Sequence, residues 1–158
     1  MRQSEREIRD VSVKDQLVEE MKQAMKSRDE IALSTIRLVR AAVRNAEIEQ
    51  GEDLDDDGVA EVIQREAKRR REAIEAYDKA DRTDLADRER AELEILRRYL
   101  PEQLGEIEIA EIVRGIIAEV GAVGPKDKGK VMGLLMQRHR GRVDGKTANQ
   151  VADTILQG

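Results

Sequence analysis

Apolar residues recur every three or four positions along most of the chain, which is the pattern of helices that bury one face. Before residue 100 the spacing predicts four helices. The first begins at Ser12, and the second begins at a capping box formed by Ser27 and Glu30 and runs to Gly51. The third runs from about Asp57 to Lys79, and the fourth begins near Leu85 and stops at Pro101. The first two are joined by a short turn, so we expect them to pack antiparallel.

Three shorter helices are predicted after residue 100. The first carries an apolar stripe from Ile109 to Val120, the second follows Pro125 and runs up to Gly141, and the third is capped by Asp144. Nine of the 11 glycines and both prolines lie in this part. We therefore predict a flexible N-terminus over 1–11, a helical subdomain over 12–100 and a three-helix subdomain over 101–158.

The composition favours an all-α fold. Charged residues make up 40% of the chain, there is no Phe, Trp or Cys, and only two tyrosines are present. Straight-chain helix formers are abundant, whereas the aromatic residues that favour strands are nearly missing. A chain without Cys excludes disulfides, zinc–thiolate sites and cysteine nucleophiles, and it suggests a reducing cytoplasm. No apolar run approaches the length of a membrane span, so we expect no membrane partner.

Charge is distributed unevenly along the chain. The net charge of −5 argues against an unspecific coat on nucleic acid, and we expect no DNA partner. Residues 126–146 nevertheless contain seven basic and two acidic side chains, a local charge of +5. Gly129 and Gly133 lie one helical turn apart in this segment. They indicate either tight helix packing or a ligand backbone that approaches closely.

Three other motifs suggest chemistry that their details do not support. The segment from Gly124 to Lys130 has P-loop spacing, but Val131 follows it and has no hydroxyl for magnesium. Asp53 to Gly58 matches the start of a calcium-binding loop, but Gln64 at the twelfth position is no bidentate carboxylate. The single histidine, His139, has no evident catalytic partners. We therefore expect no catalytic residue, no metal and no cofactor.

Two basic runs occur in the first subdomain. One includes Arg69 and Arg70 and alternates with glutamates at the favourable i,i+4 spacing, which predicts a self-neutralised, solvated helix face. The other consists of Arg37, Arg40 and Arg44 on the second predicted helix.

The C-terminal segment carries a family resemblance. The stretches Lys128-Gly-Lys-Val-Met-Gly133 and Gly141-Arg-Val-Asp144-Gly-Lys146 resemble the YqeY family, which is related to the tail of the B subunit (GatB) of the tRNA-dependent amidotransferase. Residues 36–38, 46–49 and 99–101 support the resemblance, which covers about 13–157. Gly105 departs from a usual Ser or Thr cap, and Val143 replaces a frequent Ala.

The resemblance implies an N-terminal helical bundle and a three-helix tail. Family members are often labelled carbon–nitrogen ligases with glutamine as amido-N-donor, but the catalytic parts of the amidotransferase lie outside the tail, which helps to hold tRNA. We therefore expect a non-catalytic tRNA-binding module associated with amidotransferase or aminoacyl-tRNA synthetase components. The alternative is a protein–protein interaction module that has lost tRNA contact.

The expected tRNA contacts are basic side chains of the C-terminal segment, with three glycines allowing close approach. A turn at Gly141 should bring Arg142 and Lys146 beside Lys128 and Lys130. The complete set is Lys128, Lys130, Arg138, Arg140, Arg142 and Lys146, together with Gly129, Gly133 and Gly141.

Limited proteolysis tests the predicted boundaries. Because exposed loops between helices are cut before the helices themselves, the first cleavages should fall at 51–57 or 101–106. Mass spectrometry of the early fragments identifies these sites. First cuts inside 85–98 or 109–119 would show that the boundaries are wrong.

Overall fold

The computed structural model describes residues 11–158, so the N-terminus predicted to be flexible falls outside the described residues except for Val11. Over this range the chain forms seven α-helices and one 3₁₀ turn and contains no strand, which confirms the all-α prediction. The chain divides into two compact units, one ending at Tyr99 and the other beginning at Leu100. We call them unit 1 and unit 2.

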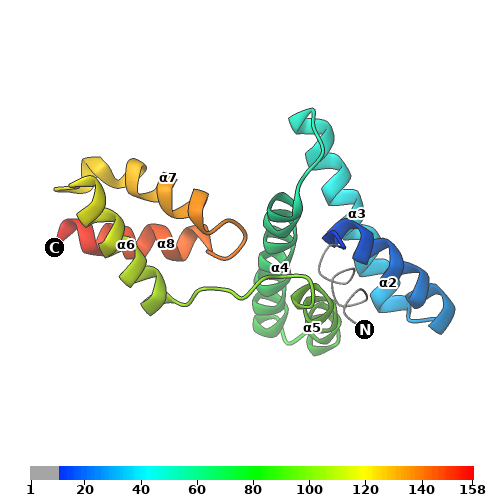
Figure 1. The fold of residues 1–158 in the computed structure, drawn as a ribbon. Helices are drawn as coiled ribbons and strands as arrows, with labels where there is room; N and C mark the ends of the chain where they lie inside the picture. Colours follow the sequence, from blue (N-terminus) through cyan, green and yellow to red (C-terminus); the bar gives the residue numbers. More distant parts are fainter. Residues whose placement is uncertain (1–10) are drawn as a thin grey trace, which may run out of the picture. The chain divides into compact units, whose positions relative to one another are not determined.

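The helices of both units appear in Figure 1. In unit 1 they are α2 (Val13–Ser27), α3 (Glu30–Gln50), α4 (Asp56–Lys79) and α5 (Thr83–Arg97). In unit 2 they are α6 (Glu106–Val120), the 3₁₀ turn η1 (Pro125–Asp127), α7 (Lys128–Arg138) and α8 (Gly145–Gln157). Over residues 11–158, no helix is both long and apolar enough to span a bilayer.

Two of the predicted helix caps are confirmed and one is wrong. The Ser12 hydroxyl accepts the amide of Asp15 at 3.1 Å, and the Asp144 carboxylate accepts that of Thr147 at 3.0 Å. The capping box at Ser27 does not form. Ser27 is instead the last residue of α2, because the left-handed backbone of Arg28, with φ of 57°, ends that helix. The following residue, Asp29, caps α3.

The fourth predicted helix ends earlier than expected. The helix α5 stops at Arg97, and the amides of Arg98 and Tyr99 bond to carbonyls three residues back, at 3.3 and 3.1 Å. Such bonds tighten the last turn. Leu100 precedes Pro101, whose ring disfavours helical geometry at the residue before it, so the chain leaves the helix here.

Each unit has its own aliphatic core. In unit 1, α4 packs extensively against α5, and α2 packs against α3. The Tyr99 hydroxyl donates to the Glu20 carboxylate. Unit 2 is closed by contacts of α6 with both α7 and α8. The fully buried side chains of unit 1 include Leu17, Val39, Val59, Ile63 and Leu96, and those of unit 2 include Ile109, Val113, Val131, Leu135 and Val143.

One arginine lies within the packed face of α4. Arg70 is 8% exposed and forms an ion pair with Glu66 one turn earlier. Its Nε also lies 3.4 Å from the Glu92 carboxylate of α5. The predicted self-neutralised face is therefore partly buried. A buried charge of this kind is tolerated only while its partners remain in place.

Removing this arginine should destabilise unit 1. Arg70→Ala leaves the largely buried carboxylates of Glu66 and Glu92 without this cation, and we expect the free energy of unfolding to fall by about 3 kcal/mol. Tyr77 and Tyr99 are the only tyrosines, so denaturant unfolding followed by tyrosine fluorescence reports on unit 1. The control is Arg69→Ala, whose side chain is 74% exposed. A loss for Arg70→Ala no larger than that of the control would contradict the assignment.

Candidate nucleic-acid interface

The basic segment predicted from the sequence runs through three elements of unit 2. It begins in η1, follows the whole of α7 and ends in the first turn of α8. Val131 and Leu135 anchor α7 in the core, which leaves the opposite side of the helix in solvent. His139 is half-buried at the C-terminal end of α7.

Two of the predicted contact residues are held in ion pairs. The Lys128 ammonium lies 2.7 Å from the Asp153 carboxylate of α8. The Arg138 guanidinium donates two hydrogen bonds to the Glu119 carboxylate of α6, at 2.8 and 2.7 Å. These bonds lower the pKa of Glu119 below its ordinary value. Lys128 and Arg138 therefore join the three helices of unit 2, and their charges are largely compensated.

Arg142 also has a structural role. Its Nε donates to the carbonyl of Glu102 at 3.0 Å, and its own carbonyl accepts the amide of Leu104 at 2.8 Å. Beside it, Gly141 is buried and adopts a left-handed conformation with φ of 74°. Its carbonyl accepts a bond from Gln103 at 2.7 Å. These hydrogen bonds from Arg142 and Gly141 hold residues 102–104 against the turn that precedes α8. The remaining arginine of the predicted set, Arg140, is half-buried.

Apart from Lys128, the lysines of the segment are free to contact a partner. Lys126, Lys130 and Lys146 are exposed, and none forms an ion pair with any residue from 11 to 158. Between the first two, Asp127 accepts the amide of Val123 at 2.9 Å. That hydrogen bond is the main cause of the lowered pKa of Asp127, with smaller contributions from Lys126 and Lys130.

The structure does not bring Lys146 beside Lys128, so this expectation is wrong. Lys128 pairs with Asp153, which lies seven residues beyond Lys146 on α8. Seven residues correspond to roughly 10 Å along a helix axis. The predicted residues therefore form two groups, one at the start of α7 and the other around the turn from Arg138 to Lys146.

The two glycines of α7 are open to solvent. Both Gly129 and Gly133 are exposed, and apart from their own stretch of α7 no atom of residues 11–158 lies within 4 Å of the position that a Cβ would occupy at either. Tight packing against another helix of this chain is therefore excluded for residues 11–158. One face of α7 carries little side-chain cover, and we call it the bare face. It consists of the exposed residues Gly129, Gly133 and Gln137, which are spaced one turn apart, and Lys130 lies at its edge.

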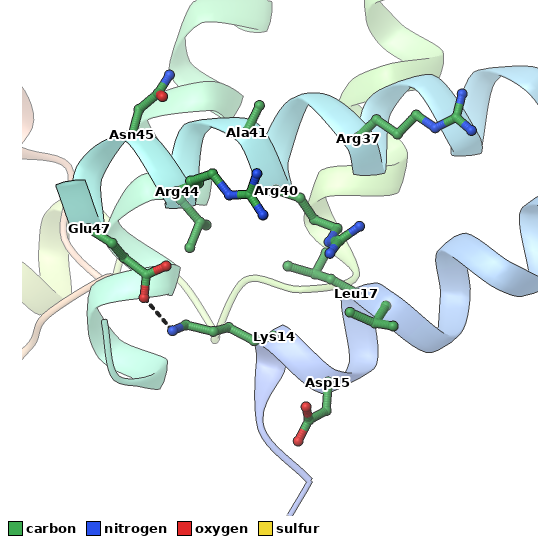
Figure 2. A pocket seen from close by; sticks show the side chains of 11 residues that line it. Lys14, Asp15, Leu17, Arg37, Arg40, Ala41, Arg44, Asn45 and Glu47 are labelled. Carbon is green, nitrogen blue, oxygen red and sulfur yellow. Dashed lines mark hydrogen bonds and ion pairs between the residues drawn. The ribbon is translucent and has the colours of Figure 1, made fainter. Parts of the chain in front are cut away.

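Unit 1 contains a basic groove that the sequence reasoning did not propose as a site. It lies between α2 and α3 and includes Arg37, Arg40 and Arg44 (Figure 2). Their i, i+3, i+7 spacing was a usable signal, because it places three cations on one helix face. Only one glutamate, Glu47, follows at a matching position, three residues after Arg44, whereas the basic run of α4 has several.

Comparison with known proteins assigns the chain to a family. The family model described as "Yqey-like protein" matches residues 14–156, so the chain belongs to this family. It is similar to "Altered inheritance of mitochondria protein 41, mitochondrial" of Pyrenophora tritici-repentis, with 32% identity over 140 residues, covering 87% of this chain and 77% of the relative. The protein of the same name from Lachancea thermotolerans is 32% identical over 112 residues, covering 69% and 60% respectively. These names place the relatives in mitochondria.

Alanine substitutions distinguish the open glycines from the constrained one. Gly133→Ala should stabilise unit 2 by about 0.5–1 kcal/mol, because alanine is the better helix former and there is room for its methyl group. Gly141→Ala should destabilise unit 2 by about 1–2 kcal/mol, because its backbone is left-handed. Hydrogen exchange of the buried amides of α6 to α8 measures both effects. A destabilising Gly133→Ala would show that the face is not open.

Proposed function

We propose that this protein is a non-catalytic accessory module that binds tRNA through unit 2. The proposal is supported by the resemblance of unit 2 to the tail of the tRNA-dependent amidotransferase. The bare glycine face of α7 is the observation that carries it. An exposed helix face with two glycines has lower helical propensity than one with alanines, and no packing within residues 11–158 compensates for this cost. Close approach of a partner to the helix backbone explains why glycine occupies both positions.

The charges beside this face suit phosphate groups. Lys130 lies at its edge and Lys126 lies in η1, and neither is neutralised by an ion pair within the described residues. Lysine binds phosphate as a point charge and provides no planar match to a base edge. Contacts of this kind position an RNA backbone and depend on its shape rather than its sequence.

Base stacking is not part of the proposal. The chain contains two aromatic residues, Tyr77 and Tyr99, and both belong to unit 1. Single-stranded RNA is usually held by stacking bases on aromatic side chains. A structured RNA, recognised through backbone and 2′-hydroxyl groups, therefore fits unit 2 better than an unpaired strand.

The proposed setting is the cytoplasm, in association with amidotransferase or aminoacyl-tRNA synthetase components. The absence of Cys favours a reducing compartment, whereas the two relatives described above are named as mitochondrial. In this setting the protein holds tRNA while the partner supplies the chemistry.

Neutralising the available lysines tests the proposal. We expect Lys126→Gln with Lys130→Gln, the two exposed lysines beside the bare face of α7, to weaken binding of total tRNA several-fold. The slope of log affinity against log salt should become shallower by about 0.9 for each lost duplex phosphate contact. Fluorescence anisotropy with labelled tRNA at several salt concentrations measures both quantities.

The matched control is Lys22→Gln with Lys26→Gln, which removes the same charge from exposed positions of α2. This pair should leave the salt slope unchanged. Equal losses from the two variants would show a diffuse electrostatic attraction and contradict the proposed surface. If the wild-type protein binds no tRNA at low salt, tRNA binding is refuted and a protein–protein interaction module takes its place.

A further inference from the structure

The groove between α2 and α3 has the size and the walls of a ligand site. Its volume is about 440 Å³, which lies within the range of small-molecule pockets. The apolar part of its lining includes Val18 of α2 and Ala41 of α3, and the buried Leu17 and Val43 lie beneath. The polar part is dominated by cations. A ligand that fits therefore combines an uncharged body with negative charge.

Three arginines line the α3 side of the groove. Arg37, Arg40 and Arg44 share one face of the helix and extend over roughly 10 Å of its axis. Figure 2 shows the side chains of Arg40 and Arg44 on the side of α3 that faces α2. A guanidinium offers a planar fork of donors that matches the oxygens of a phosphate group.

Within the described part of the chain, the acidic residues of the groove form no ion pair with these arginines. Glu47 accepts hydrogen bonds from the Lys14 ammonium and, at 2.8 Å, from the amide of Leu54. These bonds, the one from Lys14 above all, lower the pKa of Glu47, and the charge of Arg44 makes a minor contribution. The Asp15 carboxylate points away from the arginines in Figure 2. No ion pair within the described residues involves any of the three arginines.

Of the three arginines, Arg40 gives the strongest indication of a bound anion. It is half-buried, and its Nη1 lies 3.2 Å from the sulfur of Met21 on α2. A thioether is a weak hydrogen-bond acceptor and carries no charge. A guanidinium with only such a partner keeps most of its five donors available to an anion in the groove. The side chain is thus held between two helices without an ion-pair partner among the described residues.

We propose that this groove binds a nucleoside phosphate, either as a free nucleotide or as the 5′-phosphorylated end of an RNA strand. The phosphate groups lie on Arg40 and Arg44, and the sugar and base lie on the apolar wall, where the plane of the Arg37 guanidinium is available to stack on the base. The site belongs to unit 1 alone, so it is independent of the tRNA surface proposed for unit 2.

The test is a nuclear magnetic resonance titration of the full ¹⁵N-labelled chain. The four nucleoside 5′-diphosphates are added separately and compared with adenosine and with inorganic pyrophosphate. We expect saturable shifts of amides within 14–18 and 37–47 for the diphosphates, a much weaker response to pyrophosphate and none to adenosine. A pair of RNA tetranucleotides, with and without a 5′-phosphate, tests the strand end as the source.

Two double variants make the test specific. Arg40→Gln with Arg44→Gln removes two guanidinium groups. It should weaken diphosphate binding at least about tenfold, because hydrogen bonds to charged groups are lost. Arg71→Gln with Arg98→Gln removes the same charge from exposed positions outside the groove and should change the affinity little. Arg44→Gln alone changes an exposed side chain and serves if the double variant does not fold.

Each outcome decides the proposal. Binding of the diphosphates, or of only the 5′-phosphorylated tetranucleotide, supports it and identifies the source of the phosphate. The proposal is overturned if none of these ligands shifts the groove amides at about 10 mM. It is also overturned if pyrophosphate binds as tightly as the diphosphates, or if the shifts map to residues 126–146.

Discussion

The need to build two cores almost entirely from aliphatic side chains constrains the rest of this molecule. Without Phe or Trp, burial depends mainly on stripes of Leu, Ile, Val and Ala along the helices, and Tyr99 is the one buried aromatic side chain among residues 11–158. Long amphipathic helices satisfy this need, and the same spacing places the charged 40% of the chain on their outer faces. Function must therefore be sought where an outer face departs from the pattern of paired charges. The glycine face of α7 and the arginine groove of α3 are two such places.

These two features differ in physical character. The face of α7 is bare, convex and flanked by lysines, so it suits the backbone of a large anion. The groove of α3 is concave, has an apolar wall and carries arginines, so it suits one small phosphorylated group. By contrast, the arginines around Arg138 and Arg142 already have partners in unit 2 and mainly stabilise its fold. Density of positive charge alone is thus a poor guide to a binding surface.

The fold could be predicted from the sequence because helical periodicity and caps are local signals. Ser12 and Asp144 act as the caps that their positions indicated, whereas Ser27 lost that role to Asp29 because the left-handed Arg28 shifted the helix boundary by two residues. The binding surfaces depended on long-range geometry. The distance of Lys146 from Lys128 follows from the pairing of Lys128 with Asp153 on α8. The weak partner of Arg40 required the register of α2 against α3, which no local motif specifies.

The most direct test of the central claim is crosslinking in native lysate, followed by sequencing of the bound RNA and mapping of the crosslinked peptides. If unit 2 binds tRNA, the recovered RNA is enriched in tRNA and the crosslinks concentrate within residues 126–146. Recovery of a stoichiometric protein partner without RNA would contradict tRNA binding by unit 2. So would crosslinks to tRNA that fall on the paired faces of α4 and α5.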